Sequence, residues 1–233
     1  MSTLWAVIPA AGSGSRLGAR QPKQFLELEG RSLLDWSLSA LLEAVSLAGV
    51  AVALPAGRAD PERRGALADP RVTLCTGGDS RAESVSLGLR ALPAADDDWV
   101  LVHDAARPCV PAVDIRRLVE RVTGSGIGGI LACRVNDTLK RGDDEGRVTA
   151  TVLRDDLWRA LTPQMFRVGE LRGALEESLA RGAPITDEAS AVEHCAGRVQ
   201  LVEASAENIK VTYPEDIPLA AYWLSRQRRE SAA

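Results

Sequence analysis

The residues best suited to chemistry share one loop near the N-terminus, where small side chains alternate with basic ones. An apolar run at residues 4–8, short enough to be a buried strand, leads into this loop, which extends to residue 24. Gly12 and Gly14 lie at its start, and glycine lets backbone N–H groups approach a bound anion because it has no side chain and tolerates positive φ. The loop also carries three basic residues: Arg16, Arg20 and Lys23. This combination predicts a cradle for a polyphosphate.

Two well-known phosphate-binding loops do not match this segment. A P-loop needs a Gly-Lys pair, and no such pair occurs in the chain. A dinucleotide fingerprint needs a third glycine, which here comes one residue late at Gly18, after the basic Arg16. A basic residue inside the loop favours a free triphosphate over a pyrophosphate held at a helix end. The glycines alone would also suit an ordinary strand-to-helix turn with surface charges.

Two later segments could contribute to the same site. Ser80 and Glu83 have the spacing of a helix capping box, and the glycines at 77 and 78 precede them. Such a helix N-terminus is a second place for an anion or polar group. Asp104 follows an apolar run at 99–102, which places a carboxylate at the carboxyl end of a buried strand, where open α/β sheets bind ligands.

The overall composition is that of an ordinary globular protein. The chain has 233 residues, 45% of them hydrophobic and 26% charged, and a net charge of −4. This charge argues against a general field that attracts nucleic acid or an acidic membrane, so an anionic substrate needs local positive charge. Arginine greatly outnumbers lysine, and the lysines at 23 and 210 therefore suggest sites that need a compact charge.

From the cysteines and the N-terminal residues we expect a cytoplasmic protein. Four cysteines stand far apart without a Cys-x-x-Cys pair, which favours reduced thiols over a zinc site or a disulfide framework. We also expect no signal peptide, because the chain enters its first strand almost at once, and no membrane span, because no apolar stretch is long enough.

Strands and helices are expected to alternate along most of the chain. Expected strands lie at 4–8, 50–54, 72–75, 99–102, 129–135 and 199–203, and expected helices start near residues 32, 60, 80, 115, 169, 186 and 214. This order predicts an α/β fold with a doubly wound, mainly parallel sheet. Residues 1–233 are expected to form a single domain.

The segment from about 136 to 154 interrupts this alternation. Its two extended runs flank a polar tip between Gly142 and Gly146, which predicts a β-hairpin. A hairpin of this length has little to bury within its own sheet, so it would either project as an arm and pair with another subunit or pack on its own domain.

Taken together, the motifs resemble the 2-C-methyl-D-erythritol 4-phosphate cytidylyltransferase family over nearly the whole chain. The motifs are Pro-Ala-Ala-Gly-x-Gly-x-Arg (9–16), Pro-Lys-Gln (22–24), Gly-Gly-Asp-x-Arg-x-x-Ser-Val (77–85), His-Asp-Ala-Ala-Arg-Pro (103–108), Asp-Thr (137–138), Leu-Thr-Pro-Gln (161–164), Ile-Thr-Asp-Glu-Ala-Ser (185–190) and Asn-Ile-Lys-Val-Thr (208–212). The resemblance implies a Rossmann variant like that of the nucleotide-diphospho-sugar transferases. It also implies an Mg²⁺-dependent reaction in which CTP and methylerythritol phosphate give CDP-methylerythritol and pyrophosphate.

The resemblance also implies roles for individual residues. Arg16 and Lys23 would stabilise the transition state at the CTP phosphates, and Asp104 would help to hold either the metal or a substrate hydroxyl. The implied nucleotide site comprises Ala10, Ala11, Gly12, Gly78, Asp79, Ser84, Asp104 and Ala105. The implied site for the polyol phosphate comprises Thr138, Arg154, Thr162, Thr186 and Lys210. Without the resemblance, Asp79 and Thr186 could simply serve helix N-termini, and Thr162 a turn.

In that family the hairpin is exchanged across a homodimer, so Thr138 and Arg154 would complete the partner's site. The nucleophile is a phosphate monoester whose second pKa is about 6, so no general base is required and neither His103 nor His194 receives a catalytic role. His103 is instead expected to be a structural residue at a strand end. Two alternatives stay open at this point, a ribitol-5-phosphate cytidylyltransferase and a non-catalytic nucleotide-sensing module.

Overall fold

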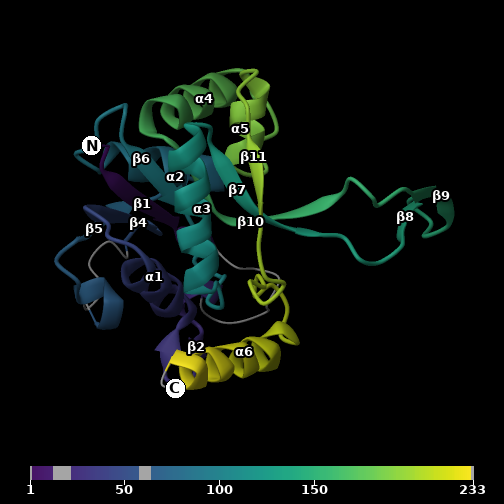
Figure 1. Ribbon diagram of the computed structural model, residues 1–233, viewed down its shortest axis with the longest axis horizontal. Coiled ribbons are helices and arrows are strands. Elements are labelled where there is room, and N and C mark those ends of the chain that lie inside the picture. The colour runs from purple at the N-terminus through teal and green to yellow at the C-terminus, as the bar shows by residue number, and fades with distance from the viewer. Residues whose placement is uncertain (1, 13–21, 58–63, 232–233) are drawn as a thin grey trace.

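The computed structural model describes residues 2–12, 22–57 and 64–231. Within this part of the chain, a seven-stranded sheet has the order β11-β7-β10-β6-β1-β4-β5 (Figure 1). Its strands are β1 (Leu4–Pro9), β4 (Gly49–Leu54), β5 (Val72–Thr76), β6 (Trp99–Val102), β7 (Gly129–Arg134), β10 (Trp158–Arg167) and β11 (Gln200–Glu203). The β1–β4, β1–β6, β4–β5 and β7–β11 pairs are all parallel. The predicted α/β fold with a mainly parallel sheet is therefore confirmed.

Side chains of the central strand β1 enter two separate cores, because successive residues of a strand point to opposite faces. Ala6 and Ile8 join a core with Leu38 of α1 (Leu33–Ala44) and Ile115 of α3 (Ala112–Ser125). Val7 joins the core on the other face, which the helices α2 (Arg81–Arg90), α4 (Val168–Ala180) and α5 (Glu188–His194) supply. Helices thus cover both faces of the sheet, as a doubly wound fold requires.

Two helices that approach the carboxyl edge of the sheet begin at side-chain caps, near the helix starts expected at residues 32 and 80. The Ser32 hydroxyl accepts a hydrogen bond from the Asp35 N–H at the start of α1. At the start of α2, Ser80 and Glu83 form a complete capping box. These bonds satisfy backbone donors that a helix start otherwise leaves without partners, so they fix where each helix begins.

Strand β10 has no counterpart in the sequence prediction. It runs antiparallel to both of its neighbours, β6 and β7, and it contains Pro163 after a cis peptide bond. A proline inside a strand normally argues against that strand, because it removes a backbone donor. Here the register of the pairing between β10 and β7 shifts between Ala160 and Gln164. Pro163 therefore lies within an irregular part of the strand.

A second difference concerns the expected helix at 60–67. Residues 58–63 lie outside the described part of the chain, and the next described element is a 3₁₀ turn at Gly65–Ala68. Two other short elements, a 3₁₀ turn at Lys23–Phe25 and the β2–β3 pair (Glu27–Leu28 and Arg31–Ser32), connect the N-terminal loop to α1.

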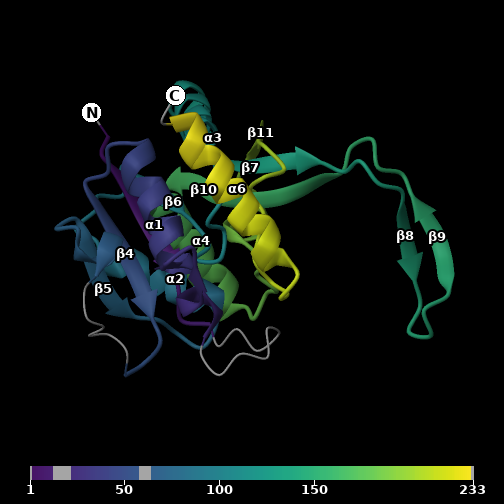
Figure 2. The same ribbon diagram turned by 90° about the horizontal axis from the view of Figure 1, so that it is seen from below.

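The interruption at about 136–154 is a β-hairpin, as predicted. Strands β8 (Leu139–Gly142) and β9 (Val148–Val152) pair antiparallel and extend away from the seven-stranded sheet, as two perpendicular views show (Figures 1 and 2). The hairpin leaves apolar side chains in solvent, since Val148 is 64% exposed and the neighbouring Leu153 is 85% exposed. The last described element is α6 (Asp216–Ser231), and none of the described helices is long and apolar enough to cross a membrane.

Candidate active site

A cavity of about 730 Å³ opens where the parallel strands β1, β4, β5 and β6 end. Its wall contains the residues that follow β1, the glycine pair after β5, and Asp104 after β6. Parallel strands deliver their carboxyl ends to one edge of a sheet, which is why segments distant in sequence meet here. The segment 208–212 reaches the same wall, because the Val211 N–H donates to the Ala106 carbonyl (2.8 Å).

The first loop is held in place by a buried glutamine. The side-chain amide of Gln24 donates to the carbonyl oxygens of Ala10 (2.6 Å) and Gly12 (3.0 Å). Gln24 is almost completely buried, so these hydrogen bonds are shielded from competing water. The Gln24 contacts also position the adjacent Lys23, whose ammonium lies 3.4 Å from the Val211 carbonyl oxygen.

The second loop packs directly against the first. A Cβ atom added at Gly77 would overlap the side chains of Ala11 and Ser84, so only glycine allows the two loops to approach this closely. The Ser84 hydroxyl accepts from the Gly78 N–H (3.1 Å) and donates to the Ser80 carbonyl (2.9 Å). The N-terminus of α2 therefore faces the cavity with its positive dipole end.

Asp104 is the buried anion at the centre of the wall. Its carboxylate contacts the guanidinium of Arg81 (2.9 Å), the ammonium of Lys210 (2.8 Å) and, more distantly, the guanidinium of Arg107 (3.4 Å). Burial alone would raise the pKa of Asp104, but these three cations outweigh burial and hold the pKa well below its usual range. Asp104 is therefore ionised at neutral pH.

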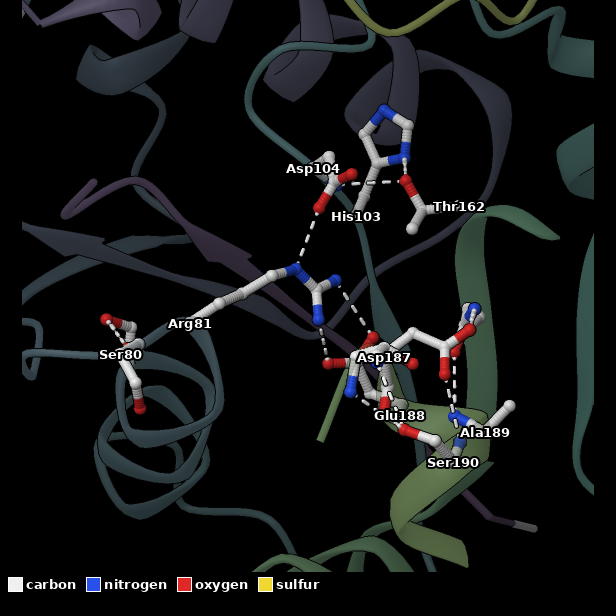
Figure 3. A network of polar contacts seen from close by, with 12 residues as sticks. Ser80, Arg81, His103, Asp104, Thr162, Asp187, Glu188, Ala189 and Ser190 are labelled. Carbon is white, nitrogen blue, oxygen red and sulfur yellow. Dashed lines mark hydrogen bonds and ion pairs between the residues drawn. The ribbon is translucent and has the colours of Figure 1, made fainter. Parts of the chain in front are cut away.

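Arg81 bridges Asp104 to a second buried carboxylate, Glu188, which is the first residue of α5 (Figure 3). The two terminal nitrogens of Arg81 donate to the two oxygens of Glu188 at 2.6 and 3.0 Å, while its Nε donates to Asp104. Burial lowers the pKa of Arg81, but both carboxylates oppose this and raise it overall. Bidentate pairing of this kind holds the guanidinium in one orientation.

His103 and Thr162 form the layer behind Asp104. The Thr162 hydroxyl accepts from the Asp104 N–H (3.0 Å) and lies 3.0 Å from Nδ1 of His103. Nε2 of His103 lies 3.1 Å from the Arg107 carbonyl, which can only accept, so Nε2 carries the proton and Nδ1 accepts from Thr162. His103 is fully buried, as expected for a structural residue, and burial lowers its pKa from 6.5 to about 4.

The cavity brings together ten of the predicted site residues. They are Ala10, Ala11, Gly12, Lys23, Gly78, Asp79, Ser84, Asp104, Ala105 and Lys210. Arg16 and Arg20 lie outside the described residues. Their positions relative to the cavity therefore stay predictions.

The remaining predicted residues do not line the cavity. Thr162 is buried behind it, with both hydrogen-bonding functions of its hydroxyl engaged. Thr186 is exposed just before α5, where its N–H donates to Ser190 (3.1 Å). Thr138 and Arg154 are exposed at the base of the hairpin, where the Arg154 guanidinium donates to the Asn136 carbonyl.

Three residues organise the site without having a role predicted from the sequence, namely Gln24, Arg81 and Glu188. Each belongs to one of the family motifs, so the sequence signal was present. Their partners, however, lie 12 to 107 positions away along the chain and could not be inferred from spacing.

No group of three or more histidine, cysteine, aspartate or glutamate side chains among the described residues is arranged to hold a metal ion. Both oxygens of Asp104, the carboxylate expected to help with a metal, already contact protein cations. A hard divalent cation prefers several oxygen ligands, which the described wall does not supply.

Comparison with known proteins gives consistent results. The family model described as 2-C-methyl-D-erythritol 4-phosphate cytidylyltransferase matches residues 4–226. The protein of that name from Ectopseudomonas mendocina is 47% identical over 98% of this chain and its own full length. The one from Aeromonas hydrophila is 49% identical over 99% of this chain and 93% of its own. A crystal structure of the Francisella tularensis protein of the same name superimposes with a TM-score of 0.82 at 34% identity, covering 95% of this chain and all of the other.

The buried neutral His103 predicts a specific loss of stability in mild acid. Its folded-state pKa of about 4 lies below 6.5, so the unfolded chain binds the extra proton first and the free energy of unfolding falls as pH drops from 6.5 to 4. We expect His103→Asn to reduce this fall by up to about 3 kcal/mol. Urea denaturation across this range, with wild type in parallel, measures it. Equal pH dependence in both proteins would contradict a neutral buried imidazole.

Proposed function

Because the chain belongs to the 2-C-methyl-D-erythritol 4-phosphate cytidylyltransferase family, we propose that its cavity is where CMP passes from CTP to 2-C-methyl-D-erythritol 4-phosphate. The products of this reaction are 4-diphosphocytidyl-2-C-methyl-D-erythritol, an intermediate of isoprenoid precursor biosynthesis, and pyrophosphate. The observation that carries the proposal is the meeting of two glycine-containing loops with Lys23 and Lys210 at one cavity.

The chemistry needs positioning and charge more than it needs a base. A phosphate oxygen of the acceptor attacks the α-phosphorus of CTP, a new P–O bond forms, and the bond from the α-phosphorus to the bridging oxygen breaks to release pyrophosphate. The attacking phosphate has a second pKa of about 6 and is already anionic at neutral pH. The barrier is the approach of two anions and the charge that builds on the leaving group, and fixed cations lower it. We assign this task to Lys23 and Arg16.

The two sides of the cavity suggest two binding regions. The nucleotide is assigned to the loops around Gly12 and Gly78, whose small residues line the cavity and let a bound phosphate approach the backbone. The acceptor phosphate is assigned to Lys210, which keeps 41% of its side chain exposed despite its contact with Asp104. Thr186 and Thr162 remain proposed parts of the acceptor region, Thr186 directly and Thr162 through the wall behind Asp104.

Mg²⁺ is proposed to arrive with CTP. The described residues do not fit a metal site built by the protein alone, because the contacts of Asp104 are already made to protein cations. The triphosphate itself supplies the anionic oxygens that Mg²⁺ prefers. We therefore assign the metal to the CTP phosphates and not to Asp104.

The hairpin supports a proposed homodimer. We propose that residues 1–233 act as a single nucleotidyltransferase domain and that the arm at 136–154 packs on a second copy of the chain. The exposed apolar side chains of Val148 and Leu153 favour burial against another surface, and an isolated hairpin is marginally stable in water. Thr138 and Arg154, which do not line their own cavity, would then approach the partner's. A cytoplasmic location is proposed as well, in keeping with the four free cysteines.

The reaction is tested by measuring pyrophosphate release from purified protein with a panel of substrates. We expect release with CTP, Mg²⁺ and 2-C-methyl-D-erythritol 4-phosphate, and little with ribitol 5-phosphate or with ATP, GTP and UTP. Mass spectrometry of the product confirms the CDP linkage. A preference for ribitol 5-phosphate would reject the proposed acceptor, and equal use of all four nucleotides would reject the proposed cytosine specificity.

Lys23→Ala is expected to lower kcat by about 10²- to 10³-fold, the range for loss of one preorganised electrostatic donor. The fold should survive, because Lys23 lies in a 3₁₀ turn at the cavity and not in a buried core. Arg121→Ala, which removes an exposed basic side chain of α3 outside both the cavity and the arm, is the control. Near-wild-type turnover in Lys23→Ala would remove the assigned role.

Replacing residues 139–152 with a short Gly-Ser turn is expected to give a monomer that still binds CTP weakly but does not transfer CMP. The reason is that the deletion removes the proposed dimer contact while leaving the cavity-lining residues in place. Light scattering, CTP calorimetry and pyrophosphate release measure the three properties. Glu120→Ala, an exposed change on α3 outside the arm, serves as control, and a fully active monomer would defeat the proposed arm exchange.

A further inference from the structure

The bridge from Glu188 through Arg81 to Asp104 is not explained by binding of either substrate. Glu188 is completely buried, and its two oxygens are both engaged by Arg81. It therefore has no direct access to the cavity, although Arg81 and Asp104 both line the wall. Burying a carboxylate costs free energy unless the carboxylate is paired, so the presence of a buried acid behind the cavity wall calls for a functional explanation.

The geometry of the bridge divides the donors of Arg81 between two acids. Glu188 takes both terminal nitrogens, so only Nε reaches Asp104, and it does so at the Oδ1 oxygen. The Oδ2 oxygen of Asp104 is thereby left by Arg81 for Lys210 at 2.8 Å, with Nε of Arg107 as a more distant second partner at 3.4 Å (Figure 3 shows Arg81 between the two acids). A guanidinium without Glu188 has two parallel N–H donors available, and such a fork matches both oxygens of one carboxylate.

From this division we infer that Glu188 is a positioning residue, which acts through Arg81 to keep one oxygen of Asp104 available for Lys210. The inference rests on the proposed role of Lys210 in binding the acceptor phosphate. Without Glu188, Arg81 turns toward Asp104 and takes both of its oxygens. Lys210 then loses the contact that aims its ammonium.

Neighbouring contacts hold the backbone of the segment that carries Lys210. Arg107 donates to the Asn208 carbonyl (2.8 Å), and the Asn208 amide donates to the Thr162 carbonyl (2.7 Å). The segment that carries Lys210 is therefore anchored, and only the direction of its long side chain remains to be set. Asp104 sets that direction, which is why the availability of its second oxygen matters.

The charges of the cluster agree with this arrangement. Asp104 and Glu188 supply two negative charges, and Arg81, Arg107 and Lys210 supply three positive ones. The cluster therefore has one positive charge in excess. We assign it to Lys210, because its side chain is the most exposed of the three cations: 41%, compared with 28% for Arg81 and 10% for Arg107. Glu188 thus neutralises Arg81 without competing for the phosphate.

The test compares Glu188→Gln with Lys210→Met and the double variant, using steady-state kinetics for each substrate. Glu188→Gln is expected to raise KM for 2-C-methyl-D-erythritol 4-phosphate about 10- to 100-fold, the scale of one charged hydrogen bond. KM for CTP should stay within about twofold of wild type. The double variant should be no worse than Lys210→Met alone, because both changes remove the same aimed ammonium. Glu193→Gln, an exposed glutamate on the same helix, is the matched control and should behave as wild type.

The outcomes separate this inference from the proposed function. If Lys210→Met leaves the acceptor KM unchanged, the assignment of Lys210 under the proposed function is wrong. If Lys210→Met raises it but the losses of the two single variants multiply in the double variant, Glu188 acts elsewhere and the inference is overturned. An equal rise of both KM values in Glu188→Gln also overturns it, since that indicates general loosening of the site.

A second variant covers the case in which Glu188→Gln does not fold. Arg81→Gln combined with Glu188→Gln removes both partners of the buried pair and leaves no charge alone, so it is expected to fold. Asp104 then keeps Lys210 without competition from Arg81, so the acceptor KM should stay well below that of Lys210→Met, whatever else the loss of Arg81 from the cavity wall costs. An acceptor KM as high as that of Lys210→Met in this folded protein contradicts the competition between Arg81 and Lys210.

Discussion

The buried carboxylate of Asp104 is the constraint on which the rest of the site depends. Ionised and almost completely buried, it would be unstable without the cations around it. Those cations come from the start of α2, from the turn after β6 and from the segment before α6. Satisfying one charge therefore fixes the relative positions of three segments that are distant in sequence. The same contacts leave the ammonium of Lys210 exposed at the cavity, in reach of an anionic substrate.

A second constraint is the small distance between the two loops at the edge of the sheet. Ala11, Gly77 and Ser84 are in such close contact that a single added Cβ atom at Gly77 would force them apart. Small residues and a buried glutamine replace the apolar packing that holds the rest of the fold, since Gln24 binds two backbone carbonyls of the first loop. The two loops are thereby held together at the wall of a cavity about 730 Å³ in volume.

Much of this could be predicted because the signals are local. The capping box at Ser80 and Glu83, the alternating strands and helices, and the hairpin depend on residues within a few positions of one another. Strand β10 could not be predicted in this way, because Pro163 argues against a strand and only pairing with β6 and β7 outweighs that local signal. The role of Arg81 was missed for a related reason, since its partners Asp104 and Glu188 are 23 and 107 positions away.

By itself, the sequence determined the α/β fold class, the family, the reaction, and ten residues that meet at one cavity. These conclusions depend on residue types in a fixed order, which is information that a sequence contains. Only the tertiary structure decided how charge is shared at that cavity. Whether a buried arginine binds one acid or two depends on distances of a few ångströms between separate elements, and Coulomb and hydrogen-bond energies change steeply over that range. Glu188 shows the difference, because its sequence context suggests a helix start, and its position in the fold makes it the counter-charge of Arg81.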